Sequence, residues 1–169
     1  METLLQRLDQ DLVDVVVGRL ASGYGSDNYE VEKLCEDHPL FVAREGHRLV
    51  DRPVELDDLL DFPWILAALP NIVRQQLEFA VQDAGTRPMS EVISAQLSNL
   101  TLRLASQSDT LILVPQCILS EVSESYRLRP VQCHLPLHLS ALVAITRGDK
   151  PRTTTISAFL AQLRHELSR

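Results

Sequence analysis

The sequence predicts an α/β fold, in which strands and helices alternate along most of the chain. Short apolar segments rich in valine, isoleucine and leucine are typical of strands. Between them, apolar residues recur every three or four positions, which is typical of amphipathic helices. Because this alternation continues through the 169 residues, it favours α/β over a fold that segregates its strands and helices.

The first helix and strand are expected within the first eighteen residues. Leucines at helical spacing predict a helix over residues 2–12. Val13–Val17 follows as a β-branched run interrupted only by Asp14, which predicts a strand that is buried on both faces and ended by Gly18. Residues 21–28 have the composition of a loop.

The remaining elements alternate as far as the C-terminus. Extended segments are expected where apolar and β-branched residues cluster, at residues 29–43, 64–68, 91–94, 110–114, 127–133 and 139–146. Helices are expected where the apolar spacing is helical, at residues 54–60, 71–84, 97–104, 117–127 and 155–168.

Several residues mark the ends of these elements. Asn71 is expected to cap one helix at its N-terminus, and Gly85 follows its last turn. Thr154 or Thr155 is expected to cap the final helix, whose apolar face has five members, Ile156, Phe159, Leu160, Leu163 and Leu167. The apolar faces of the 71–84 and 155–168 helices are core faces, or alternatively one of them is a subunit interface.

Composition excludes several classes of function. With 45% hydrophobic residues, the chain can bury the core of one globular domain, either as a single body or as two lobes. A net charge of −7, with basic residues scattered singly, argues against direct contact with DNA. No apolar run is long enough to span a membrane, and no secretory signal opens the chain. Three irregularly spaced cysteines predict buried free thiols in a reducing cytoplasm.

The sequence gives no support for catalysis or for a cofactor. Cys133, His134 and His138 lack the second pair of ligands that a metal site would need, so no metal is expected. The chain contains no Gly-x-Ser-x-Gly nucleophile motif and no glycine-rich nucleotide loop. We therefore expect a binding protein that is not an enzyme.

Several phrases in a fixed order carry a resemblance to a known family. They are Val13–Gly18, Arg44–Leu49, Val54–Ile65, Asp109–Pro115 and the closing strand, turn and helix of 141–167. In this order they resemble the effector-binding domain of LysR-type transcriptional regulators, over nearly the whole chain. Ser108 and Thr110 depart from the family's usual glycines, and Arg48 stands at the usual proline.

The resemblance implies a two-lobed, periplasmic-binding-protein-like (type 2) α/β fold. Lobe one would comprise residues 1–35 and 138–169, and lobe two residues 36–137. A small-molecule effector, such as a sugar or an aromatic or other organic acid, would bind between the lobes and shift a DNA-bound homodimer or tetramer. The family's first strand and helix of lobe one, and the winged helix that contacts promoter DNA, would lie before Met1.

The resemblance also implies which residues form the pocket. Lobe one would contribute Gly18 and Arg19, and Arg19 could pair with a carboxylate unless it is simply a solvated strand-end residue. Lobe two would contribute residues at the ends of its strands, namely Ala68, Leu69, Pro70, Asn71, Ser94, Gln96, Ser98, Pro115 and Gln116. For Asn71 and Ser94 the alternative is a plain helix cap, and the two roles are compatible.

Two alternatives remain open at the level of the sequence. The chain could be a stand-alone solute-binding protein of the same fold, which would need an export signal and a first strand of its own. It could also be a truncated domain that binds no ligand and only oligomerises through an open sheet edge. A ligand that raises thermal stability would exclude the truncated, ligand-free alternative.

Overall fold

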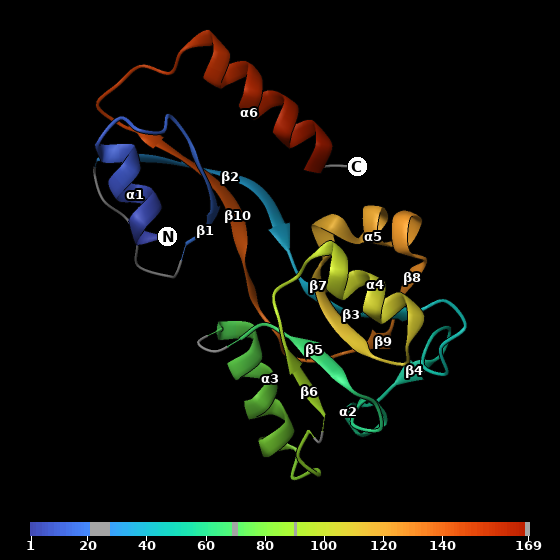
Figure 1. The fold of residues 1–169 in the computed structure, drawn as a ribbon. Coiled ribbons are helices and arrows are strands. Elements are labelled where there is room, and N and C mark those ends of the chain that lie inside the picture. The colour runs from blue at the N-terminus through green and yellow to red at the C-terminus, as the bar shows by residue number, and fades with distance from the viewer. Residues whose placement is uncertain (21–27, 69–70, 90, 168–169) are drawn as a thin grey trace. The chain divides into compact units, whose positions relative to one another are not determined.

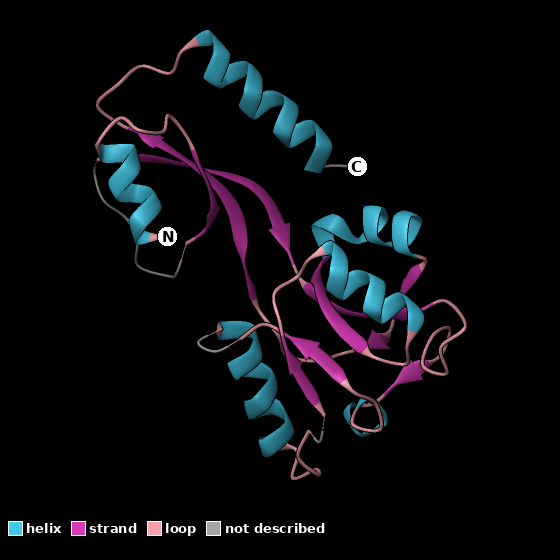
Figure 2. Cartoon of the chain, viewed as in Figure 1, coloured by secondary structure: helices cyan, strands magenta, loops and turns pink. Residues whose placement is uncertain are grey.

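A computed structural model describes residues 1–20, 28–68, 71–89 and 91–167 (Figure 1). The chain divides into two compact units. Unit one comprises Met1–Asp37 and Ser140–Arg169, and unit two comprises His38–Leu139. Each unit combines a β-sheet with helices, as the alternating sequence pattern predicted (Figure 2).

Unit one is built around a three-stranded sheet in the order β1-β10-β2. The strands are β1 (Val16–Arg19), β10 (Leu139–Arg147) and β2 (Tyr29–Asp37), and β1 is antiparallel to β10. Successive residues of a strand point to opposite faces, so β10 serves two small cores. Val143 and Ile145 pack with α1 (Glu2–Asp9), whereas Ala144 packs with α6 (Thr154–Leu167).

Unit two contains a five-stranded sheet in the order β6-β5-β7-β3-β8. Its strands are β3 (Pro39–Arg44), β5 (Trp64–Leu66), β6 (Val92–Ser94), β7 (Leu111–Pro115) and β8 (Leu128–Pro130). Strand β5 is parallel to β6 and β7, whereas β3 is antiparallel to β7 and β8. Strands β4 (Pro53–Val54) and β9 (Gln132–Cys133) form a separate, parallel two-stranded sheet in the same unit.

Helices cover both faces of the unit-two sheet (Figure 1). Helix α3 (Ile72–Asp83) packs on one face with a core that includes Trp64, and the short α2 (Leu56–Leu59) contributes to the same core. Helix α4 (Asn99–Gln107), the 3₁₀ turn η1 (Gln116–Ile118) and helix α5 (Leu119–Tyr126) pack on the other face. The sheet therefore has two cores, one on each face.

Several details differ from the sequence-based expectations. Gly18 does not end β1, which continues to Arg19, and Val17 is exposed, so the strand is not buried on both faces. β1 lies at the edge of a sheet with only three strands, which leaves part of its surface uncovered. The leucines whose spacing predicted α4 lie on its exposed side, and its buried side is Thr101, Leu102 and Ala105.

The final helix also differs in its cap and in its apolar face. Thr153, rather than Thr154 or Thr155, caps α6, because its Oγ1 accepts a hydrogen bond from the Ile156 amide at 3.2 Å. Phe159 is exposed, and Leu160 is the buried member of the expected apolar face. The narrow three-stranded sheet beneath α6 cannot cover all five apolar side chains. Most of the expected 21–28 loop lies outside the described residues.

Candidate functional site

A small pocket lies where strands β5 and β7 of unit two end, next to the N-terminus of α3. Its volume is about 200 Å³. Eleven residues line it, namely Pro39, Leu66, Ala67, Asn71, Val73, Arg74, Leu97, Leu113, Val114, Pro115 and Leu139. In open α/β sheets, ligands bind beyond the carboxyl ends of parallel strands, so this is the position where a binding site is expected.

Asn71 connects the pocket to helix α3. Its side-chain oxygen accepts a hydrogen bond from the Arg74 amide at 3.0 Å, and its extended backbone makes it the N-cap. Gly85 adopts a positive φ of 62° after the last turn, as expected for a C-terminal glycine. The first amides of a helix have no intrahelical acceptor and carry partial positive charge, so this wall favours an anionic or hydroxyl group.

Arg74 braces the polar side of the pocket. Its guanidinium donates to the Glu78 carboxylate at 2.8 Å, to the Ala67 carbonyl at 3.2 Å and to Ser94 Oγ at 2.9 Å. These contacts join the ends of β5 and β6 to the first turns of α3. Sequence reasoning missed Arg74, because only its spacing from Glu78 is visible in one dimension. Since Glu78 neutralises the charge of Arg74, we infer that Arg74 positions the strand ends that form the pocket.

The rest of the pocket wall is apolar. Leu66, Val73 and Val114 are buried, and Leu97, Leu113 and Leu139 complete the surface. The residues predicted from the sequence belong to the segments that follow the strands, and these aliphatic residues are not among them. Such residues look like ordinary core in a sequence, and only the sheet order brings β5, β7 and the start of α4 to one place.

The structure brings some of the predicted lobe-two residues to this pocket. Asn71 and Pro115 line it, and Ser94 accepts a hydrogen bond from Arg74, which also lines it. Ala68 is exposed immediately after the pocket residue Ala67. Leu69 and Pro70 lie outside the described residues.

The other predicted residues of lobe two shape the neighbouring loops. Ser98 caps α4 through its hydroxyl, and the Gln96 carbonyl accepts a hydrogen bond from Thr101 Oγ1 at 3.1 Å. The Gln116 amide donates to the His38 carbonyl at 2.8 Å, which ties the end of β7 to the start of β3. Their roles in ligand binding stay predictions.

The two predicted residues from unit one lie on β1. The Arg19 guanidinium donates to the Asp37 carboxylate and to the Ser140 carbonyl, so it joins β1 to β2 and to β10. The Asp37 side chain is fully buried, whereas that of Arg19 is 24% exposed. Gly18 is a half-buried strand residue that precedes Arg19. The pairing with Asp37 gives Arg19 a structural role, and its contact with an effector stays a prediction.

The possible metal ligands and the cysteines are the remaining candidates for chemistry. Within residues 1–20, 28–68, 71–89 and 91–167, no group of three metal-ligating side chains converges. The three cysteines are half-buried rather than fully buried as expected, and burial raises the pKa of Cys133 to about 11, which keeps its thiol protonated. None of the described helices is long and apolar enough to cross a membrane.

The fold is that of an α/β domain, with a pocket at the carboxyl ends of two parallel strands. The LysR substrate binding domain family matches residues 1–168, and the chain belongs to that family. The family and the relatives found are transcriptional regulators, not enzymes. The structural relatives also confirm the expected two-lobed, periplasmic-binding-protein-like class of fold.

Two groups of relatives support this assignment. The chain is 24% identical over 165 residues to the HTH-type transcriptional regulator GbpR of Azospirillum brasilense, covering 96% of this chain and 48% of the relative. It thus spans about half the length of that regulator. A putative transcriptional regulator from Vibrio parahaemolyticus has a TM-score of 0.72 at 21% identity, covering 99% of this chain and 77% of that one.

A third relative was solved with a ligand. The effector binding domain of QuiR in complex with shikimate has a TM-score of 0.65 at 13% identity, covering 97% of this chain and 76% of that one. At this identity the likeness concerns the fold alone.

Proposed function

We propose that this chain is the effector-sensing part of a LysR-type transcriptional regulator. The pocket at the ends of β5 and β7 carries the proposal, because it combines an apolar wall with a helix N-terminus. Lobe one would comprise residues 1–35 and 138–169, and lobe two residues 36–137. An effector bound between these lobes would shift the population of lobe arrangements. Promoter DNA would be contacted through a separate DNA-binding domain, in the cytoplasm.

The effector that best suits this pocket is an organic acid with a ring or another compact hydrocarbon body. A sugar would place several hydroxyls against aliphatic side chains, and every buried hydroxyl without a partner costs free energy. Asn71 and the first amides of α3 would receive the polar group, and Arg19 would supply a cationic contact.

The experiment is a thermal-shift screen of the chain with aromatic carboxylates, alicyclic carboxylates and sugars. A ligand that binds only the native state at about 100 times its Kd stabilises it by about 2.7 kcal/mol. We expect a carboxylate to raise the Tm and sugars to leave it unchanged. If sugars alone raise the Tm, the sensing role stands and the organic-acid assignment is wrong. If no small molecule does so, the sensing role fails.

A matched pair of leucines tests the location of the pocket. Leu97 lines it and is 41% exposed, whereas Leu104 is 42% exposed and lies further along the same segment, on α4. Leu97→Asp should lower ligand affinity at least tenfold, because it places a carboxylate in the apolar wall. Leu104→Asp should leave the affinity unchanged. Equal affinities for the two variants would place the ligand elsewhere.

The proposed regulator acts as a homodimer or tetramer, and α3 presents a surface suited to that contact. Ile72 and Phe79 are 62% and 67% exposed and lie seven residues apart on one side of the helix. Strand β6 nearby is an edge strand of the sheet, with an exposed Ile93. We expect Phe79→Ser to weaken self-association in sedimentation experiments, and Phe159→Ser, an exposed control on α6, to leave it unchanged.

A further inference from the structure

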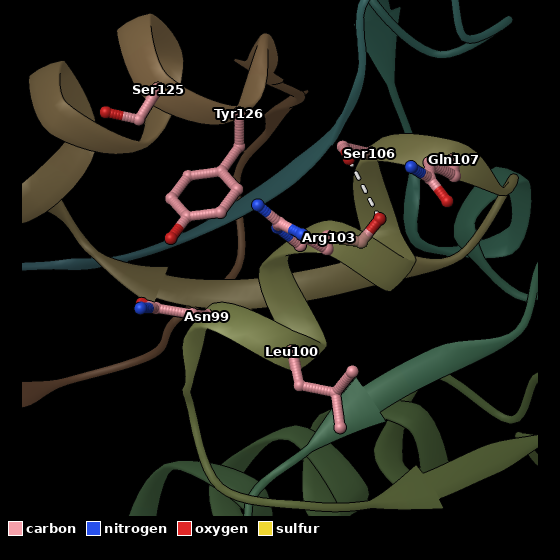
Figure 3. Close-up of a pocket in the computed structure, with 7 residues that line it drawn as sticks. All are labelled: Asn99, Leu100, Arg103, Ser106, Gln107, Ser125 and Tyr126. Atoms are coloured by element: carbon pink, nitrogen blue, oxygen red, sulfur yellow. Dashed lines mark hydrogen bonds between the residues drawn. The ribbon is translucent and has the colours of Figure 1, made fainter.

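Helices α4 and α5 lie side by side on one face of the unit-two sheet and border a groove of about 860 Å³ (Figure 3). Its wall is polar and apolar in about equal parts and includes Asn99, Leu100, Arg103, Gln107, Ser125 and Tyr126. Its volume is within the range of about 300–1,000 Å³ that small-molecule sites occupy. We infer that this groove is a second ligand site, which takes a small hydroxylated metabolite carrying a phosphate or carboxylate group.

The charge in the groove is the first observation behind this inference. Arg103 is the charged residue of the lining, and no carboxylate lies among the described residues that line the groove. Elsewhere in this chain of net charge −7, most described arginines and lysines are paired with carboxylates. Arg103 has no such partner among the described residues, so its guanidinium is available to an external oxyanion.

The arrangement of the polar side chains is the second observation. Asn99, Arg103 and Gln107 are spaced four residues apart on α4 and therefore lie along one side of that helix (Figure 3). Tyr126 extends its side chain from α5 toward this row and also packs against the core on this face of the sheet, and Ser125 precedes it on the same helix (Figure 3). A guanidinium binds phosphate or carboxylate with two parallel hydrogen bonds. The amides and hydroxyls both donate and accept, which suits the hydroxyl groups of a ligand.

The groove shares a structural element with the strand-end pocket. Leu97, just before α4, lines that pocket, and Asn99, the first residue of α4, lines the groove. A shift of the start of α4 therefore changes both walls. Any coupling between the two sites would act by the same factor in both directions.

The test is an NMR titration of the ¹⁵N-labelled chain with glycerol 3-phosphate, with glycerol as the neutral counterpart. We expect saturable amide shifts in α4 and α5 with glycerol 3-phosphate and none with glycerol. Arg103→Gln should raise the Kd about tenfold or more, because it removes a charge-assisted contact. Arg7→Gln is the matched control, since Arg7 is an exposed arginine in the last turn of α1 in unit one.

Three outcomes would overturn the inference. Amide shifts that fail to saturate through the millimolar range would show no site for this chemistry. An equal loss of affinity in Arg7→Gln would show that the affinity for glycerol 3-phosphate depends only on the net charge of the protein. Line broadening that grows with protein concentration and disappears in Leu100→Ser would show instead that this face contacts another protein molecule.

Discussion

Replacing Arg19 with methionine separates a structural role of this residue from a role in effector binding. The variant keeps the apolar stem but removes the guanidinium from the Asp37 carboxylate, whose side chain is fully buried. Breaking a buried ion pair by removing one partner costs about 3–5 kcal/mol. Because the Arg19 side chain is 24% exposed, we expect a loss near the lower end, about 3 kcal/mol.

The assay is equilibrium unfolding in urea followed by far-UV circular dichroism. With a slope of about 2 kcal/mol per molar urea, the midpoint should fall by about 1.5 M. Adding Asp37→Asn should recover most of the loss, because the amide carries no charge. Lys33→Met, which breaks the exposed pair with Glu36, is the control and should cost less than about 1 kcal/mol.

The reasoning would be refuted if Arg19→Met shifted the midpoint no more than Lys33→Met does. If stability were unchanged while effector affinity fell at least severalfold, Arg19 would instead be a ligand contact. If both stability and affinity fell, and Asp37→Asn restored only stability, Arg19 would have both roles.

Two further predictions concern the core of unit two. Trp64→Phe should lower the free energy of unfolding by about 2 kcal/mol in urea, because it removes the hydrogen bond to the Leu59 carbonyl and leaves a void beside Phe41. The control variant Phe159→Leu, on the exposed side of α6, should change the urea midpoint little. Burial lowers the pKa of His47 below its ordinary value of 6.5, so the folded state favours the neutral ring. This contribution to stability is present above pH 6.5 and is lost as the pH falls below it, so the Tm should drop between pH 7.5 and 5.5. The His47→Gln variant should show a smaller drop in Tm. An unchanged pH dependence of the Tm in this variant would contradict the assignment.

The boundaries of the elements were well predicted where local chemistry decides them. Asn71 and Gly85 bracket α3 because a side-chain oxygen can satisfy a first-turn amide and glycine tolerates a positive φ. Gly46 likewise adopts a φ of 77° in the turn that follows β3. The N-cap of the last helix was predicted less well. Three neighbouring threonines offer the same hydroxyl, and only the path of the backbone selects Thr153.

Burial was predicted less reliably than helix or strand type. The leucine spacing around Leu100 indicated a helix correctly, but tertiary packing turned that side to solvent and buried Thr101, Leu102 and Ala105. Helical periodicity is a local property, whereas burial depends on which neighbouring element covers a face. A one-dimensional pattern cannot distinguish a core stripe from an exposed stripe of the same residues.

The sequence by itself determined the α/β class, the order of helices and strands, and the resemblance to the LysR effector-binding domain, because these depend on periodicity and on motifs close in the chain. Tertiary structure alone decided that Arg74 donates a hydrogen bond to Ser94, that Arg19 pairs with Asp37, and that Arg103, which has no carboxylate partner among the described residues, lines a groove between two helices. Each of these depends on the sheet order or on helix packing. Both bring side chains together across sequence separations that no local pattern records.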